Sequence, residues 1–319
     1  MSVKVSVIVP IYNAAKTLPA CLGNLVHQTL EEIELILVND ASTDQSLDIL
    51  LDCEREFSDK VIVVNLEQNS GPGGARNAGL CYASGEYIGF ADSDDIPDIH
   101  MYERLYKLAS RGSYDMVDGA YYNENTDTLI LQTGDECTGF LDADKRCKLI
   151  AGGGYLWSRL FRRELFSDLR FRENTILEDM ETLMLLFMRT KKLGTTRELV
   201  YQYCAANNSA SKLSDPARYQ KAIADAMRAI ANTLLPLADY SGVQTAVEYS
   251  LLHLYLCGIV NTIHPNHALP PMVQHAYLSE LKQLRCQYVK LSYEENPYVH
   301  QKFSADDLQV IKNIDLQEI

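Results

Sequence analysis

The stretch Tyr87-Ile-Gly-Phe-Ala-Asp-Ser-Asp-Asp95 places three carboxylates directly after a short apolar run. A strand buried in a parallel sheet has such a run, and open α/β sheets bind ligands beyond the carboxyl ends of their strands. We therefore expect Asp92, Asp94 and Asp95 at a crevice. Neighbouring carboxylates repel one another unless a cation is present, and oxygen ligands suit Mg²⁺ or Mn²⁺. The stretch predicts a metal site.

A polar turn is the other interpretation of these aspartates, because Asp and Ser form local hydrogen bonds where strands end. A calcium-binding EF-hand loop does not fit, since Pro97 stands where that loop requires glycine. From this stretch alone, the turn and the metal site both remain open.

The chain before this stretch alternates between β-branched apolar runs and leucines at helical spacing. This β-α-β-α-β order implies an α/β protein with a largely parallel sheet. The first two strands are each followed by polar residues, which places further candidate side chains at the same edge. Strands are predicted at 3–10, 33–38 and 61–66, and helices at 16–27 and after Ser42.

The segment Asn69-Ser-Gly-Pro-Gly-Gly-Ala-Arg-Asn-Ala-Gly79 contains four glycines but no standard nucleotide-binding motif. It lacks the lysine of a P-loop, and the third glycine of the dinucleotide fingerprint is replaced by Arg76. We predict a flexible turn into a helix, with Arg76 in the first turns as a partner for a diphosphate. A purely structural glycine turn is the alternative.

Later in the chain, strands are predicted at 115–122, 128–131 and 195–204, while 123–154 gives no clear pattern. The single tryptophan, Trp157, has two interpretations, core packing or stacking on a sugar. Glu178 and Asp179 precede a helix with a methionine-rich core face, so they are interpreted either as favourable charges at a helix N-terminus or as catalytic groups.

From Asp215 onward the pattern is helical. We therefore expect two domains, 1–210 with the sheet and 211–319 as a helical subdomain whose role in acceptor binding or interaction is undefined.

Composition excludes several classes of protein. With 319 residues and 47% apolar residues the chain can bury a core, and its formal charge of −14 disfavours nucleic-acid binding. The eight cysteines lack paired spacing, which predicts reduced thiols. We find no signal peptide and no apolar run long enough to span a membrane, so a cytoplasmic protein is expected.

These motifs resemble glycosyltransferase family 2, whose members use the GT-A fold, a Rossmann-like α/β/α sandwich with a mixed sheet. The resemblance covers residues 3 to about 205. It is carried by Val7-Ile-Val-Pro-Ile-Tyr-Asn13, Val38-Asn-Asp-Ala-Ser-Thr-Asp44, Gly71-Pro-Gly-Gly-Ala-Arg-Asn-Ala-Gly79, Asp92-Ser-Asp-Asp95 and Glu178-Asp179, in the family's order and spacing.

The resemblance implies roles for individual residues. Pro10 and Tyr12 match the loop that lines uracil and ribose, Asp40 matches the aspartate that binds the uracil ring, and Arg76 matches a basic residue near the donor diphosphate. One departure is that the family's usual Asp-Asp-Gly-Ser reads Asn39-Asp-Ala-Ser here, which loses one charge and one glycine.

The same resemblance assigns the remaining site. Asp92 and Ser93 match the donor-binding part of the D-x-D motif, Asp94 matches the ligand of Mn²⁺ or Mg²⁺, and Asp179 matches the catalytic base beside Glu178. The Gln-x-x-Arg-Trp motif of processive members is absent.

The implied activity is inverting transfer of a single hexosyl or N-acetylhexosaminyl group. The donor is a nucleotide-sugar, with UDP-sugar favoured, and the acceptor is a carbohydrate or a lipid-linked molecule. A lipid-linked acceptor would require peripheral contact with the inner face of the membrane. A sugar-phosphate nucleotidyltransferase and a non-catalytic nucleotide-sugar-binding protein are the alternatives.

Overall fold

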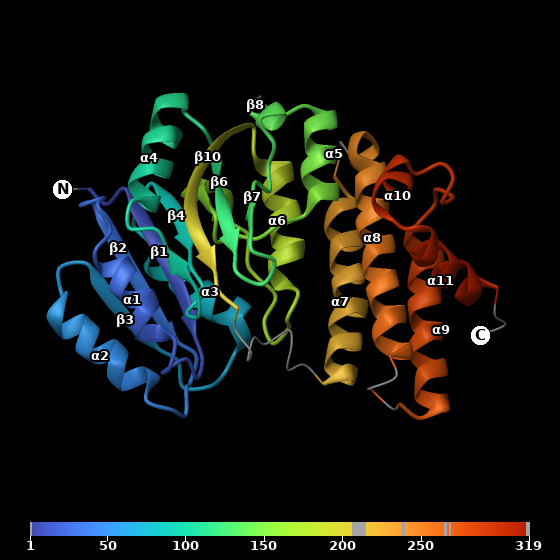
Figure 1. The fold of residues 1–319 in the computed structure, drawn as a ribbon, viewed down its shortest axis with the longest axis horizontal. Helices are drawn as coiled ribbons and strands as arrows, with labels where there is room; N and C mark the ends of the chain where they lie inside the picture. The colour runs from blue at the N-terminus through green and yellow to red at the C-terminus, as the bar shows by residue number, and fades with distance from the viewer. Residues whose placement is uncertain (1, 206–214, 238–239, 265–266, 268, 317–319) are drawn as a thin grey trace. The chain divides into compact units, whose positions relative to one another are not determined.

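The computed structural model describes residues 2–205, 215–237, 240–264, 267 and 269–316 (Figure 1). Contacts between residues divide the chain into two compact units, one of residues 1–141 and 153–207 and one of residues 142–152 and 208–319. The boundary expected near residue 210 lies outside the described residues. Residues 142–152, which the sequence assigned to the sheet domain, belong to the helical unit.

The sheet unit contains the strands and five of the described α-helices. Its strands are β1 (Val5–Ile11), β2 (Ile33–Asn39), β3 (Val61–Asn65), β4 (Tyr87–Phe90), β5 (Ile96–Pro97), β6 (Met116–Asn123), β7 (Thr128–Ile130), β8 (Gly139–Phe140), β9 (Arg159–Arg162) and β10 (Lys192–Tyr203). Its helices are α1 (Leu18–Val26), α2 (Ser46–Glu56), α3 (Gly71–Tyr82), α4 (Met101–Gly112) and α6 (Glu178–Arg189), with 3₁₀ turns η1 (Asp135–Cys137) and η2 (Arg163–Phe166).

The strands form one mixed sheet in the order β3-β2-β1-β4-β9-β6-β10-β5, with β7 on β6 and β8 on β10. The part from β3 to β4 is parallel, as the alternating pattern predicted. Beyond β4 the sheet is mixed, because β9 runs antiparallel to both of its neighbours while β10 is parallel to β6. The sequence did not predict the short strands β5 and β8, which are only two residues long.

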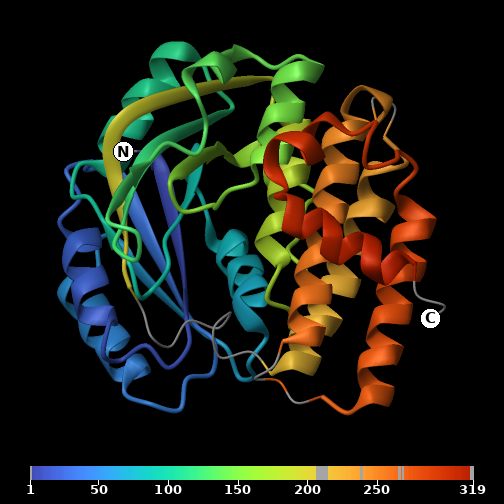
Figure 2. The same cartoon turned by 45° about the vertical axis from the view of Figure 1, so that its right-hand side comes forward.

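Helices cover both faces of the parallel part. The alternate residues Val5, Val7 and Val9 of β1 pack in one core cluster with the apolar side chains of α1. On the other face, Gly79 of α3 lies so close to β1 that a Cβ atom there would stand 2.5 Å from Ile8. Figure 2 shows α1 and α2 on one side of these strands and α3 on the other. This layering leaves the carboxyl ends of β1, β2 and β4 as the shared edge where polar loops gather.

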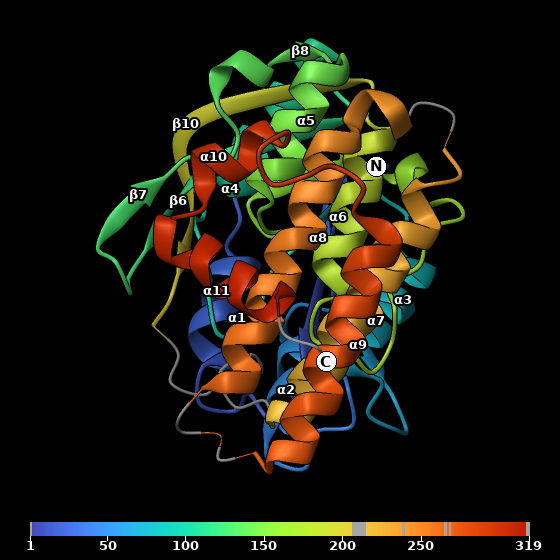
Figure 3. The same cartoon turned by 90° about the vertical axis from the view of Figure 1, so that its right-hand side faces the viewer.

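The helical unit is built around one long apolar helix, α8 (Tyr240–Ile263). The helices α7 (Pro216–Leu234) and α9 (Pro271–Tyr288) pack along it (Figure 1), and α10 (Pro297–Lys302) and α11 (Ala305–Asp315) also contact it (Figure 3). Helix α5 (Ala143–Gly152), in the region without a clear sequence pattern, packs on α8 as well.

Helix α8 is apolar around its whole circumference, which is typical of a buried helix. Among the described residues it is the one helix long and apolar enough to cross a membrane, but 72% of that window is buried within the protein. Its one acidic side chain, Glu248, is buried and accepts hydrogen bonds from the backbone N–H groups of Lys290 (2.8 Å) and Leu291 (2.7 Å). These features identify α8 as the core helix of this unit.

The family pattern has a glycine in the loop after β2 at the position of Ala41 in this chain. The backbone at Ala41 is strained. Ala41 has φ +56°, a left-handed conformation that costs a residue with a Cβ about 1–2 kcal/mol. We therefore expect Ala41→Gly to stabilise the sheet unit by about 0.5–1 kcal/mol, after allowance for the greater entropy of glycine in the unfolded chain. Chemical denaturation followed by the fluorescence of Trp157, the single tryptophan, measures this change.

Ala15→Gly, in the neighbouring loop and outside the left-handed region, is the matched control and is expected to destabilise the unit slightly. Equal destabilisation by both substitutions would show that Ala41 is not strained.

Candidate active site

The loops after β1 and β2 are joined by side-chain hydrogen bonds. The backbone N–H of Asn13 donates to Ser42 Oγ (3.0 Å), and Asn13 Oδ1 accepts from the N–H of Thr43 (2.8 Å). Asp44 Oδ2 accepts from the N–H of Ala15 (3.0 Å). These contacts explain the polar residues that follow β2, and they fix a loop on which the Tyr12 side chain is 52% exposed.

Asp40, the residue that follows β2, is buried against the start of α3. Its Oδ1 accepts a hydrogen bond from the backbone N–H of Ser70 (2.7 Å), and its backbone N–H donates to the carbonyl of Ile11 in β1 (2.8 Å). Burial raises the pKa of Asp40, although the N–H groups of Ser70 and Gly71 lower it in part. The carboxylate therefore joins β2 to the N-terminus of α3, where the helix dipole favours negative charge.

The neutral residue before Asp40, Asn39, also has a structural role. Asn39 is buried, and its Nδ2 donates to Asn65 Oδ1 (2.7 Å) at the end of β3. A second carboxylate here would be buried beside Asp40 without a cation, which is unfavourable. The departure from the family pattern at Asn39 is thus matched by its neighbour Asn65.

Arg76 connects two of the motifs that the sequence analysis singled out. Its guanidinium is buried, with Nη1 2.5 Å from Glu178 Oε1 and Nη2 3.2 Å from Asp92 Oδ1. Burial alone would lower the pKa of Arg76, but the charges of Glu178, Asp92 and Asp179 raise it. The guanidinium also lies over the ring of Phe171, 5.7 Å from its centroid. Arg76 is therefore already occupied by protein carboxylates before any diphosphate binds.

A glycine makes this arrangement possible. A Cβ at Gly73 would stand 2.2 Å from the carbonyl oxygen of Arg172 and 3.1 Å from Glu178 Cγ. Only a residue without a side chain lets the segment before α6 approach α3 so closely. The glycine-rich segment thus forms the first turns of α3, which begins at Gly71, and Gly73 admits Glu178 beside Arg76.

The three aspartates after β4 differ in exposure. Asp92, Ser93 and Asp94 are half-buried, whereas Asp95 is buried and its Oδ1 accepts from the N–H of Cys204 (2.9 Å). Burial and the charge of Asp92 raise the pKa of Asp95 to about 8. Asp95 therefore anchors the turn to the end of β10 and does not face the solvent.

Two buried residues that the sequence analysis missed form hydrogen bonds with the backbone of Asp92 in this turn. The backbone N–H of Asp92 donates to the Tyr201 hydroxyl (3.0 Å), and Cys21 Sγ donates to the carbonyl of Asp92 (3.4 Å). Both Tyr201 and Cys21 are buried. The spacing of Tyr201 and Tyr203, two positions apart in a strand, could have indicated that both face the same side of β10, but the hydrogen-bond partner of Tyr201 could not be known from the pattern.

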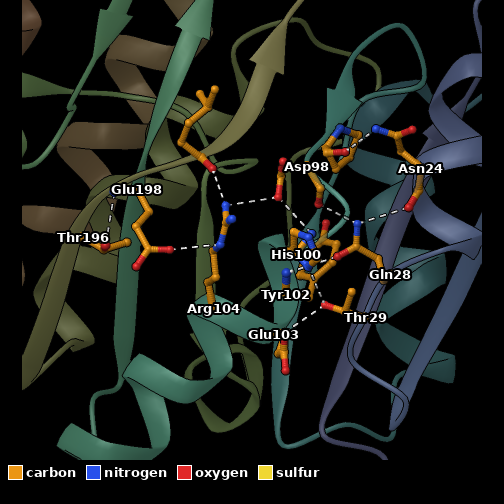
Figure 4. A network of polar contacts seen from close by, with 12 residues as sticks. Asn24, Gln28, Thr29, Asp98, His100, Tyr102, Glu103, Arg104, Thr196 and Glu198 are labelled. Atoms are coloured by element: carbon orange, nitrogen blue, oxygen red, sulfur yellow. Dashed lines mark hydrogen bonds and ion pairs between the residues drawn. The ribbon is translucent and has the colours of Figure 1, made fainter.

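The segment after the aspartates is held by a polar network (Figure 4). The carbonyl of Pro97 accepts from Asn24 Nδ2 (2.9 Å) of α1, and the carboxylate of Asp98 pairs with Arg104 of α4 (3.2 Å). Arg104 also donates to the carbonyl of Leu199 in β10 (3.0 Å), and its Nε pairs with Glu198 Oε2 (3.0 Å). The turn that carries Asp92 and Asp94 is thus fixed at its far end by α1, α4 and β10.

The chemistry of this turn fits a divalent cation. Among the described residues, no group of three or more His, Cys, Asp or Glu side chains forms a complete metal site. Mg²⁺ is usually held by only one or two carboxylates together with phosphates of a substrate. The turn provides two half-buried carboxylates, Asp92 and Asp94, and the buried Asp95 Oδ2 beside them is an oxygen acceptor without a hydrogen-bond partner. The residues present therefore suit a metal that arrives with a diphosphate.

Glu178 and Asp179 form the first turn of α6, as the sequence indicated, but they face different surroundings. Glu178 is buried against Arg76, and burial raises its pKa to about 7 despite that charge. Asp179 is half-buried, with Oδ1 accepting from the N–H of Met180 (2.8 Å). Burial raises the pKa of Asp179, while the charge of Arg76 opposes the increase. Helix-end stabilisation and a catalytic role are thus compatible at Asp179.

The interpretation of Trp157 as a residue that stacks on a sugar is wrong. Its side chain is only 3% exposed because it lies between the rings of Tyr155 and Tyr201, at centroid distances of 4.9 Å and 4.4 Å. The exposed ring in this region belongs to Tyr155.

Comparison with known proteins agrees with this arrangement. The family model described as Glycosyl transferase family 2 matches residues 6–170, about half of the chain. The uncharacterized glycosyltransferase EpsJ of Bacillus subtilis is 29% identical over 330 residues, covering 96% of this chain and 91% of that protein. A poly(ribitol-phosphate) beta-glucosyltransferase of Bacillus spizizenii is 29% identical over 206 residues, covering 63% of this chain and 32% of that protein.

Among solved structures, S. aureus TarS 1–349 in complex with UDP-GlcNAc has the same fold, with a TM-score of 0.77 at 22% identity. The match covers 98% of this chain and 90% of that chain. The fold and the family match define a GT-A enzyme that transfers glycosyl groups. This chain belongs to glycosyltransferase family 2.

The buried Arg76 leads to a prediction about stability. Arg76→Met leaves the buried Glu178 carboxylate without its cation, which is expected to cost about 3–5 kcal/mol. Adding Glu178→Gln should recover part of this loss, because the unpaired charge is then removed. Denaturant unfolding followed by Trp157 fluorescence measures both changes.

The control is Arg55→Met, which removes an ion pair exposed on α2 and should change the free energy of unfolding by less than about 1 kcal/mol. If Arg76→Met were as mild as this control, Arg76 would not be the connection between these motifs.

Proposed function

We propose that this glycosyltransferase is an inverting, metal-dependent enzyme that moves a single hexosyl or N-acetylhexosaminyl group from a UDP-sugar to a hydroxyl group. The proposed acceptor is a carbohydrate or glycolipid of polysaccharide biosynthesis. One observation carries the proposal: the buried Arg76 contacts both Asp92, in the D-x-D turn, and Glu178, next to Asp179. Through Arg76, a donor-binding turn and a candidate base lie in one site.

Two comparisons support the identity of the substrates. The TarS structure contains UDP-GlcNAc, and the Bacillus spizizenii relative is named as a beta-glucosyltransferase acting on poly(ribitol-phosphate). A UDP-hexose or UDP-N-acetylhexosamine donor and a polymeric acceptor are therefore proposed here. The proposed cytoplasmic location agrees with such a donor, and a lipid-linked acceptor would add peripheral membrane contact.

The donor side of the site is proposed to hold the nucleoside diphosphate. Pro10 and the exposed Tyr12 line the nucleoside, the Asp40 carboxylate lies at the end of β2 for the base, and Asp92 with Ser93 contacts the ribose or sugar. Asp94 would hold Mn²⁺ or Mg²⁺, which when bound neutralises the charge that develops on the leaving diphosphate. Arg76 adds positive charge beside Asp92 and keeps its carboxylate oriented.

The acceptor side depends on Asp179. An acceptor hydroxyl must lose its proton as it attacks the anomeric carbon, and a carboxylate within about 3 Å serves as general base. The raised pKa of Asp179, caused by burial, makes it a stronger base than an ordinary aspartate. Direct displacement inverts the anomeric centre, so an α-linked donor gives a β-linked product.

The donor site is tested by calorimetric titration with UDP, with and without Mn²⁺. The wild type is expected to bind UDP in a metal-dependent way, and Asp94→Ala should lose about tenfold or more of this affinity because the metal ligand is removed. Asp59→Ala, at an exposed position on the same unit, is the control and should bind like the wild type. Binding of UDP that is equally tight without metal, or in Asp94→Ala, would refute the metal site.

The base is tested by the release of UDP from UDP-glucose and UDP-GlcNAc during transfer. Asp179→Asn is expected to lower kcat by about 10²–10⁴-fold while UDP binding persists, because only proton removal is lost. A carboxylate base acts when deprotonated, so wild-type activity should fall as the pH drops through the raised pKa of Asp179. Glu164→Gln, at an exposed position, serves as the control. Full activity in Asp179→Asn would rule out this assignment.

A further inference from the structure

Four aromatic rings form a stack that begins at the aspartate turn and ends at the surface. Tyr201, whose hydroxyl accepts from the N–H of Asp92, lies against Trp157 at 4.4 Å with an interplanar angle of 14°. On Trp157 lie Tyr155, at 4.9 Å and 11°, and Tyr203, at 5.8 Å and 7°. The outermost ring, Tyr155, is 43% exposed. The stack thus connects the aspartate turn, at Tyr201, with a partly exposed aromatic ring, Tyr155.

The backbone of Tyr155 is held on both sides by polar side chains, the half-buried Gln132 and the buried Arg159. Its N–H donates to Gln132 Oε1 (2.7 Å), and its carbonyl accepts from Arg159 Nη1. Gly154, with φ +125°, precedes it, and a Cβ there would stand 2.0 Å from Gln132 Oε1. Only glycine at position 154 allows the backbone to lie this close to Gln132.

Two further buried side chains, Asp118 and Ser158, hold Arg159 and Gln132 in place. Arg159 forms an ion pair with Asp118 (3.2 Å), and both side chains are fully buried. Ser158 Oγ donates to Asp118 Oδ1 (2.8 Å) and accepts from Gln132 Nε2 (3.0 Å). Desolvating such an ion pair costs as much as its attraction returns, so it is weak evidence for stability alone. Here it fixes the position of one partly exposed aromatic ring, which is a positioning role.

The exposed ring lies on the side of the proposed base. Tyr201, at the inner end of the stack, contacts Asp92, and Asp92 is joined through Arg76 to Glu178, the neighbour of Asp179. Besides burial, the negative charge of Asp179 raises the pKa of Tyr155, which agrees with this placement. A molecule resting on Tyr155 therefore lies near the group that is proposed to take the acceptor's proton.

We propose that Tyr155 is a platform for the pyranose ring of the acceptor, so that the acceptor ends in a cyclic sugar and not in an open-chain polyol or a lipid alcohol. One face of a pyranose consists of C–H groups that pack on an aromatic ring, while its hydroxyl groups point outward. Tyrosine provides a large, rigid surface for such contact. The acceptor assignment rests on the proposed function, because it needs Asp179 as the base.

Binding to the platform is tested without any reaction. Methyl β-D-glucopyranoside, its N-acetylglucosamine analogue and ribitol are titrated, each with and without UDP, by Trp157 fluorescence and by saturation-transfer NMR. Trp157 is the single tryptophan and lies directly under Tyr155, so its emission reports contact with the platform. The wild type is expected to respond saturably to a pyranoside and not to ribitol.

Variants distinguish the platform from a general surface effect. Tyr155→Ala should bind the pyranoside about tenfold more weakly, whereas Tyr155→Phe, which keeps the ring, should bind like the wild type. Tyr82→Ala, which removes an exposed tyrosine on α3, is the control and should change nothing. In the transfer reaction, Tyr155→Ala should raise the KM for the acceptor and leave the KM for the UDP-sugar unchanged.

Several results would overturn the proposal. They are equal binding of ribitol and pyranosides, no response to pyranosides with or without UDP, unchanged binding in Tyr155→Ala, or a raised KM for the donor alone. The last outcome would place the ring on the donor side. Failure of the proposed function is recognised separately, because UDP binding is measured without an acceptor and pyranoside binding is measured without a donor.

Discussion

The guanidinium of Arg76 is buried between Asp92, after β4, and Glu178, in the first turn of α6. A buried arginine in this position requires carboxylate partners, because an isolated buried charge is far too unfavourable to persist. The buried carboxylate of Glu178 in turn depends on Arg76, and the half-buried carboxylate of Asp92 does so to a lesser degree. This mutual dependence holds the donor-binding turn and the candidate base in one place, although their residues lie far apart in the chain.

The rest of the site is arranged around this connection. Gly73 lets the segment before α6 approach α3, and Asp40 fixes the first turn of α3 from the end of β2. Asp95 and Tyr201 attach the aspartate turn to β10. The partners of these polar groups all belong to the protein, so the site is held together before any substrate binds. Such preorganisation is what a transferase needs to hold two substrates in line.

Much of the fold followed from local patterns. The parallel part of the sheet was predicted because buried strands and amphipathic helices have distinct periods, and these alternate clearly up to β4. In 123–154 only the strand at 128–131, which is β7, followed from the pattern, because helix α5 packs on α8 within the helical unit and the short strand β8 depends on pairing with β10. A strand of two residues is too short to show the alternation of apolar and polar residues that predicts a strand. For the site, motif order indicated which residues gather, but it did not reveal that Arg76 is already paired with protein carboxylates.

Sequence alone determined the class of the protein and the residues that converge at the ends of β1, β2 and β4, because a parallel sheet brings those ends to one edge whatever the details of packing. Only the tertiary structure decided how each side chain is used there. Asp95 faces inward, Glu178 binds a residue 102 positions away, and Trp157 lies beneath an exposed Tyr155. Burial and hydrogen-bond partners depend on segments that are distant in the chain. They therefore cannot be predicted from the pattern of residues within one segment.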